Sequence, residues 1–75
     1  MQLNTYYIQP HSCDPIYCLT TKRLKSGGYA GIAMQSVDSK AKYKSLQHAY
    51  PAWIEINTDD IPDYIKTAID NRANQ

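Results

Sequence analysis

Phenylalanine is absent from this chain, although seven tyrosines and one tryptophan occur among its 75 residues. Seven phenol rings cannot all be buried at low cost, because every buried hydroxyl group needs a hydrogen-bond partner. Several tyrosines are therefore expected to show their hydroxyl edges to water. The aromatic composition thus predicts a surface rich in stiff, amphipathic rings.

Long hydrophobic runs are also missing. No segment approaches the roughly 18 apolar residues of a membrane span, and residues 1–5 have neither the charged nor the apolar region of a signal peptide. We therefore expect a cytoplasmic protein with no membrane contact. Two cysteines do not make a disulfide framework, and a bridge between Cys13 and Cys18 would close only a short loop.

The length predicts a single small domain, residues 1–75, with no linker and no internal repeat. Hydrophobic residues make up 43% and charged residues 20% of the chain, which favours a folded protein over intrinsic disorder. A chain of this size buries only about 60% of its unfolded surface. It has little room for an enclosed catalytic pocket, so we predict that it is not an enzyme and uses no cofactor.

An excess of charge of one sign is missing as well, since the net charge is +1. The charges are nevertheless segregated along the chain. From residue 55 onward five carboxylates face two cations, whereas between residues 22 and 44 the single carboxylate of Asp38 faces six cations: Lys22, Arg23, Lys25, Lys40, Lys42 and Lys44. A domain with one basic and one acidic side can steer a partner of either sign.

The clearest structural pattern lies near the C-terminus. Apolar residues recur there with the spacing of one helix face: Ile61, Tyr64, Ile65, Ala68 and Ile69. Thr58, Asp59 and Asp60 are candidate N-caps, and Pro62 suits a first helical turn, which needs no amide donor. An amphipathic helix is therefore expected to begin near residue 60, with Arg72 at its C-terminal end.

Four segments have the composition of β-strands: residues 3–8, 16–21, 29–34 and 53–56. Gly27 and Gly28 predict a hairpin turn between the second and third strands. Small residues dominate the third strand, which allows the C-terminal helix to pack closely over it. Ile54 and Ile56 are expected to face the helix, while Trp53 either caps the edge of the core or lies exposed. Which face of the first strand points inward stays open.

Residues 36–50 admit two interpretations. A helix would present one face made of Tyr43, Leu46 and Tyr50. A strand would place three lysines on one face: Lys40, Lys42 and Lys44. We favour the helix, because no β-branched residue follows Val37 in this segment. The predicted order is β-β-β-α-β-α, an α+β fold in which the C-terminal helix packs on a mostly antiparallel sheet of three or four strands.

Two cysteines and two histidines supply the ligand count of a zinc site: His11, Cys13, Cys18 and His48. Their spacing is poor, because Cys18 falls inside a predicted strand, and we expect a structural cysteine and surface histidines with no bound metal. A cysteine–histidine nucleophile would need an oxyanion site and a cleft, for which no motif is present. Helix capping and the helix dipole account for a third candidate cluster, namely Asp59, Asp60 and Asp63.

No motif assigns a function directly, so the functional interpretation rests on the surface. The first hypothesis is a non-enzymatic protein-interaction module, an inhibitor or regulator that docks on a larger protein or nucleoprotein. Small inhibitors and adaptors encoded by mobile elements share this size and composition. Rigid rings would supply the contacts, and the candidate partner-binding residues are Trp53, Tyr43, Tyr50 and Tyr29.

The alternative hypothesis is a small nucleic-acid-binding protein. Single-strand binding combines cations that follow the phosphates with rings that stack on bases. The candidate residues are Lys22, Arg23, Lys25, Lys40, Lys42, Lys44, Tyr17 and Tyr29. A symmetric homodimer is compatible with either hypothesis, because a small sheet leaves edge strands bare.

Overall fold

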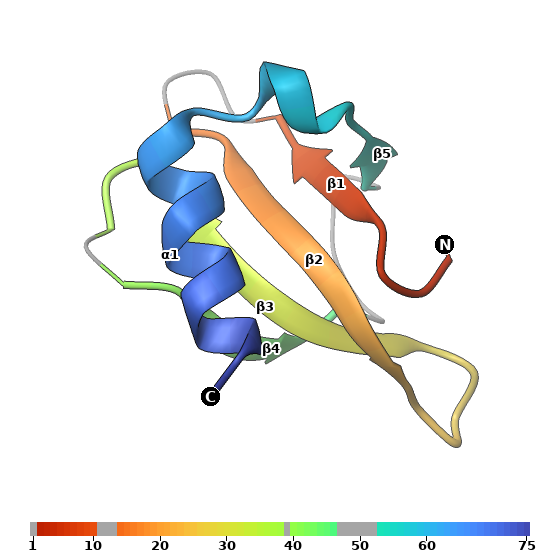
Figure 1. Ribbon diagram of the computed structural model, residues 1–75. Helices are drawn as coiled ribbons and strands as arrows, with labels where there is room; N and C mark the ends of the chain where they lie inside the picture. The colour runs from red at the N-terminus through yellow and green to blue at the C-terminus, as the bar shows by residue number, and fades with distance from the viewer. Residues whose placement is uncertain (1, 11–13, 39, 47–52) are drawn as a thin grey trace.

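The computed structural model of the protein describes residues 2–10, 14–38, 40–46 and 53–75. Within these ranges five strands precede a short 3₁₀ helix and one α-helix (Figure 1). The elements are β1 (Tyr6–Gln9), β2 (Ile16–Arg23), β3 (Tyr29–Gln35), β4 (Lys42–Ser45), β5 (Ile54–Glu55), η1 (Thr58–Asp60) and α1 (Asp63–Ala73). The predicted α+β class is confirmed.

The strands form one sheet in the order β4-β3-β2-β1-β5, and every neighbouring pair is antiparallel. β2 and β3 form the long central hairpin. Its turn is closed by hydrogen bonds from Gly27 N to Leu24 O at 3.0 Å and from Leu24 N to Gly28 O at 2.8 Å. Gly27 has φ +94°, a backbone conformation that residues other than glycine rarely adopt. The predicted hairpin is therefore present, for the predicted reason.

The central strands are buried on both faces. α1 lies across β2 and β3 on one side (Figure 1), and this helix-side cluster consists of Tyr17, Ile32, Met34, Ile61, Ile65 and Ile69. A second cluster on the opposite side consists of Tyr7, Cys18, Ala33 and Leu46. β1 serves both sides, with Tyr6 and Ile8 packed on the helix side and Tyr7 on the other. Because β1 packs on both sides, both of its faces carry apolar side chains.

Residues next to both edge strands pack in the second cluster. Leu46 follows β4 at one edge of the sheet, and Trp53 precedes β5 at the opposite edge. Leu46 belongs to the cluster with Tyr7, Cys18 and Ala33, and Trp53 packs against that cluster. The face that α1 leaves open is therefore covered in part by the two ends of the β4–β5 connection, whose residues 47–52 lie outside the described ranges.

The predicted helix over residues 36–50 is wrong where the structure describes that segment. Lys42–Ser45 forms β4, which pairs with β3 in the register Ile32 to Tyr43, so the sheet has five strands instead of three or four. Helix propensities of lysine and alanine differ from those of strand formers by only a few tenths of a kcal/mol per residue. Pairing with an otherwise bare edge of β3 outweighs that local preference.

The start of the C-terminal helix also differs from the prediction. Thr58–Asp60 forms η1, in which the Asn57 side chain accepts a hydrogen bond from Asp59 N at 3.1 Å, and α1 begins only at Asp63. Ile61 separates the two helices in an extended conformation, φ −95° and ψ 129°. The residue before a proline is driven out of the helical region, and Ile61 precedes Pro62. The predicted N-caps Thr58, Asp59 and Asp60 therefore do not cap α1.

Of the two isoleucines near β5, only one packs as predicted. Ile56 lies against the helix-side cluster. Ile54 is 55% exposed, although its register with Ile8 places it on the helix side of the sheet. α1 covers β2 and β3 and does not extend over β5, so the expectation that Ile54 faces the helix is wrong.

No helix in the described ranges combines the length and apolarity needed to cross a membrane; α1 has 11 residues.

We predict that Gly31→Ala strongly destabilises the fold. A Cβ at position 31 would run into the carbonyl oxygen of Leu19 on β2 and would lie 2.9 Å from its carbonyl carbon, so backbone would have to move. Urea unfolding should show a loss of more than about 2 kcal/mol. Lys25→Ala, in the exposed turn, is the control and should change the free energy of unfolding by less than about 0.5 kcal/mol. Equal stabilities of the two variants would contradict this prediction.

Candidate interaction surface

An open groove runs along α1 on the side that faces β4, and we name it the α1–β4 groove. Its volume is about 330 Å³, and it is lined by Lys40, Ala41, Ala68, Asn71, Arg72 and Gln75. The helical members are spaced as one helix face. Ala41 and Ala68 have no side chain beyond Cβ, which leaves the space between helix and strand unfilled. The lining contains two cations and no carboxylate.

A ring and a cation are held together at one end of the groove. The guanidinium carbon of Arg72 lies 5.1 Å from the ring centroid of Tyr43 on β4, a contact worth about 0.5–1 kcal/mol at an exposed site. Arg72 Nη1 also donates a hydrogen bond to Gln75 Oε1 at 2.9 Å. The Tyr43 ring is 55% exposed. It is therefore both fixed in place and accessible.

A second exposed ring lies at the other end of the groove. Tyr64, in the first turn of α1, is 58% exposed, and its hydroxyl donates to the carbonyl oxygen of Ser36 at 3.2 Å. Val37, the next residue in the β3–β4 connection, is 66% exposed. The Tyr64 and Arg72 Cα atoms are separated by about 12 Å along the helix axis. Exposed tyrosine rings thus adjoin lining residues at both ends of a short groove: Tyr43 contacts Arg72, and Tyr64 precedes Ala68 by one helical turn.

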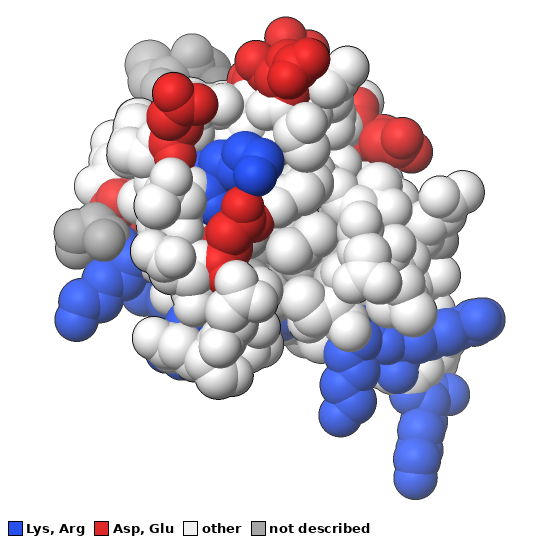
Figure 2. Space-filling view, in the orientation of Figure 1, with Lys and Arg blue, Asp and Glu red and all other residues white. Residues whose placement is uncertain are grey.

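The cations predicted to bind nucleic acid occupy three separate places. Lys22, Arg23 and Lys25 are exposed at the end of the β2–β3 hairpin, where Figure 2 shows basic side chains gathered at one end of the molecule, with carboxylates over η1 and the start of α1 at the other. Lys42 and Lys44 lie on the face of β4 opposite α1, and Lys40 lines the groove. The charge segregation of the sequence therefore persists in the fold.

The predicted rings do not form one surface. Tyr17 is 7% exposed and belongs to the helix-side cluster, so it cannot stack on a base, and its assignment as a nucleic-acid-binding residue is corrected to a core residue. Tyr29 and Trp53 are half-buried against the second cluster. Trp53 therefore caps the edge of a core, and its buried Nε1 has no hydrogen-bond partner among the described residues. Tyr50 lies outside the described ranges.

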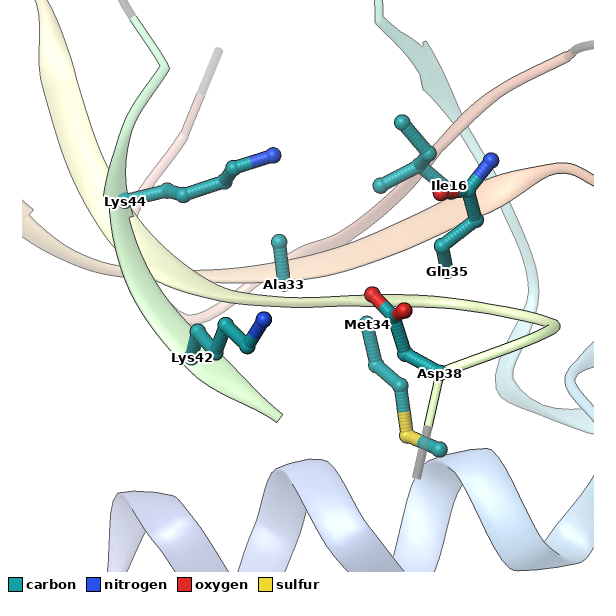
Figure 3. Close-up of a pocket in the computed structure, with 7 residues that line it drawn as sticks. All are labelled: Ile16, Ala33, Met34, Gln35, Asp38, Lys42 and Lys44. Atoms are coloured by element: carbon teal, nitrogen blue, oxygen red, sulfur yellow. The ribbon is translucent and has the colours of Figure 1, made fainter. Parts of the chain in front are cut away.

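A smaller pocket lies mainly on the other face of β3. Its volume is about 80 Å³, and its lining consists of Ile16, Ala33, Met34, Gln35, Asp38, Lys42 and Lys44. Figure 3 shows both lysine side chains extending from β4 over β3, with the small side chain of Ala33 between them and Ile16. No described carboxylate lies within ion-pair distance of Lys42 or Lys44. Among the described residues, their ammonium groups therefore have no acidic partner.

A polar contact joins β1 to α1 at the side of the helix away from the groove. The Tyr6 hydroxyl donates to Asp70 Oδ1, and Lys66 Nζ lies 2.8 Å from Asp70 Oδ2. Desolvation acts to raise the pKa of Asp70, but the hydrogen bonds from Lys66 and Tyr6 and the charge of Lys66 outweigh it, so the pKa is lowered. Burial, together with the Asp70 carboxylate, raises the pKa of Tyr6 to about 12. This contact fixes the orientation of α1 over the sheet.

The candidate zinc ligands are not brought together by the described structure. Cys18 is fully buried in the second cluster, and burial raises the pKa of its thiol to about 12 despite an opposing hydrogen bond with the Tyr7 backbone. A protonated thiol in a core is a poor nucleophile. His11, Cys13 and His48 lie outside the described ranges. Within those ranges no three histidine, cysteine or acidic side chains converge on a metal site.

The chain matched no protein-family model, no curated protein and no solved structure in three comparisons. The functional interpretation therefore rests on the residues of this chain alone.

Sequence reasoning missed most of the groove. The apolar stripe predicts that Tyr64 and Ala68 are buried. Ala68 does pack against the helix-side cluster and also lines the groove, but Tyr64 is 58% exposed. Both residues share a helix face with Arg72 at a spacing of four residues. That spacing is the signal that could have identified a second apolar face on the helix. The contribution of Ala41 carried no signal of its own, because it depends on where β4 lies.

We predict that Asp70→Asn lowers stability in a pH-dependent way. A carboxyl group whose pKa is lowered by folding stabilises the protein above its ordinary pKa of 3.8, and this contribution is lost as the pH falls through the lowered value. Urea unfolding from about pH 7 to about pH 2 should therefore show wild type and variant converging toward the acid end. Asp63→Asn, in the same helix, is the control. A difference that stays constant with pH would contradict the assignment.

Proposed function

We propose that this protein is a non-enzymatic interaction module that docks on a larger protein through the α1–β4 groove. One observation carries the proposal. Five large hydrophobic side chains are exposed among the described residues, and two of them adjoin this groove: Tyr43 contacts the lining residue Arg72, and Tyr64 lies one helical turn before the lining residue Ala68. Exposed apolar groups that gather around a hollow are typical of a binding site, whereas scattered ones are not.

The rings of this surface are already held in place before a partner binds. Arg72 packs over Tyr43, and the backbone of Ser36 accepts the hydrogen bond of Tyr64. Side chains that are fixed in the free protein lose little conformational entropy on binding, which raises affinity. Tyrosine and arginine are also enriched among residues that dominate binding energies.

The size and charge of the groove define the chemistry of the partner. A volume of about 330 Å³ is at the small end for a ligand pocket, and this groove is open to solvent. It suits a few side chains of a protein segment better than an enclosed substrate. Ala41, Ala68 and the adjoining tyrosine rings suit apolar side chains, whereas Lys40 and Arg72 favour carboxylates. An inhibitor or regulator acting in the cytoplasm on a larger protein or nucleoprotein is the role that we propose.

We predict that Tyr43→Ala and Ala68→Arg weaken partner binding more than about tenfold each, because the first removes an anchoring ring and the second fills the groove. Tagged protein is used to capture partners from the source cells, and the affinity of each variant for the captured partner is then measured. Ile54→Ala is the matched control, since Ile54 is exposed to the same extent as Tyr43, 55%, but lies outside the groove. Equal binding by all three variants, or no captured partner, would overturn the proposal.

The basic end of the β2–β3 hairpin supports a second candidate function, binding of single-stranded nucleic acid. Lys22, Arg23 and Lys25 are exposed there (Figure 2), and Arg23 is paired across the hairpin with the half-buried Tyr29. Backbone phosphates are attracted by such a cluster. In this candidate function the hairpin cations carry the binding, because Tyr17 on the sheet is not accessible for base stacking.

We predict that, if this second function holds, a mixed single-stranded oligonucleotide shifts the amide NMR signals of residues 22–29 and that added salt weakens the binding. Replacing Lys22, Arg23 and Lys25 with alanine should flatten the salt dependence by about 0.7 units of slope per lost phosphate contact. Asp59→Ala and Asp60→Ala, at the acidic end, provide the control. An unchanged spectrum at low salt would exclude nucleic-acid binding.

A further inference from the structure

The outer edge of β4 carries backbone groups that pair with no residue of the described ranges. β4 is the last strand on its side of the sheet. Leu46 N donates to Tyr29 O of β3 at 2.7 Å, and antiparallel pairs alternate between hydrogen-bonded and non-hydrogen-bonded residues. By this alternation and the observed register, the backbone groups of Lys42 and Lys44 face β3. Those of Tyr43 and Ser45 point outward, where no described residue pairs with them.

The two faces of β4 carry different chemistry. Tyr43 shares the helix side of the sheet with Ile32 and borders the α1–β4 groove through its contact with Arg72. Lys42 and Lys44 share the other side with Ala33 and Gly31. Successive side chains of a strand point to opposite faces of a sheet. A strand added beside β4 would therefore place alternate side chains next to the groove and next to the two lysines.

Charge decides which strand fits that edge. Two copies of β4 paired with each other would bring Lys42 and Lys44 of one copy beside the same lysines of the other, and like charges across a strand pair are destabilising. Edge lysines are a common guard against such self-association. The same two ammonium groups have no ion-pair partner among the described residues, and Asp38 is the one carboxylate near their pocket (Figure 3). They favour carboxylates on an incoming strand.

We infer that β4 takes up an extended segment of the partner protein as an additional strand, with acidic side chains over Lys42 and Lys44 and apolar side chains beside Tyr43. The inference rests on the proposed function and specifies the partner segment: alternating acidic and apolar residues in an extended conformation. Main-chain hydrogen bonds to Tyr43 and Ser45 supply affinity, and the alternation supplies specificity. The groove then receives the apolar side chains of the same segment.

The test uses a defined peptide and the whole protein. The probe is an acetylated and amidated hexapeptide of alternating glutamate and valine, and the matched peptide has lysine in place of glutamate. Amide hydrogen exchange is followed by NMR. The Glu/Val peptide should increase the protection of the Tyr43 and Ser45 amides, which face outward, and should leave the already bonded amides of Lys42 and Lys44 little changed. The Lys/Val peptide should bind about tenfold more weakly.

Charge exchange gives the second arm of the test. The double variant Lys42→Glu/Lys44→Glu should reverse the preference and bind the Lys/Val peptide more tightly than the Glu/Val peptide. Lys22→Glu/Lys25→Glu, which changes the net charge equally at the hairpin end, is the control and should keep the original preference. Ser45→Pro should weaken the binding of both peptides, because it removes an outward donor without breaking a bond to β3.

The outcomes separate this inference from the proposed function. Protection of the Tyr43 and Ser45 amides with the predicted charge preference supports the inference. Peptide-induced shifts confined to Ala68 and Asn71, absence of binding, or protection that rises with protein concentration without peptide would each overturn it. In the last case the edge pairs with a second copy of the chain. None of these results replaces the capture experiment with Tyr43→Ala and Ala68→Arg, which tests docking through the groove independently.

Discussion

Packing of the C-terminal isoleucines on the central hairpin is the interaction on which the rest of the structure depends. Ile61, Ile65 and Ile69 are at most 4% exposed against β2 and β3, and full burial of each is worth about 1.5–3 kcal/mol. This packing, assisted by the contact of Tyr6 with Asp70, sets the position and rotation of α1. The groove exists because the helix so placed sets the small side chain of Ala68 opposite that of Ala41, and neither fills the gap between them.

Burial of the sheet on both faces moves the accessible chemistry to its edges. β2 and β3 contribute side chains to the helix-side cluster and to the second cluster, so the centre of the sheet offers no surface to a partner. The Trp53 ring covers the second cluster and is therefore half-buried as well. The exposed rings and unpaired cations that remain lie on β4, at the ends of α1 and on the hairpin turn. The accessible rings and cations of the described residues are thus confined to a few positions.

Three of these features meet at β4. Its Tyr43 ring borders the groove, its Lys42 and Lys44 side chains border the pocket on the other face, and its outer backbone groups are unpaired among the described residues. A protein segment can engage all three features at once, whereas a nucleic acid would use only the cations. These three features are the reason that we propose a protein partner in preference to a nucleic acid.

The sequence by itself determined the elements that depend on neighbouring residues. The stripe containing Ile61, Ile65 and Ile69 predicted the C-terminal helix, and the glycine pair predicted the β2–β3 turn, because both signals arise from local geometry. The α+β class followed from them. The break at Ile61 before Pro62 was also local, but its signal was outweighed by the capping pattern. Only the tertiary structure decided that residues 42–45 form a strand, that Tyr17 and Trp53 are covered, and that Tyr43 meets Arg72. Each of these depends on contacts between residues far apart in the chain, where pairing and burial energies exceed the small local preferences that a sequence displays.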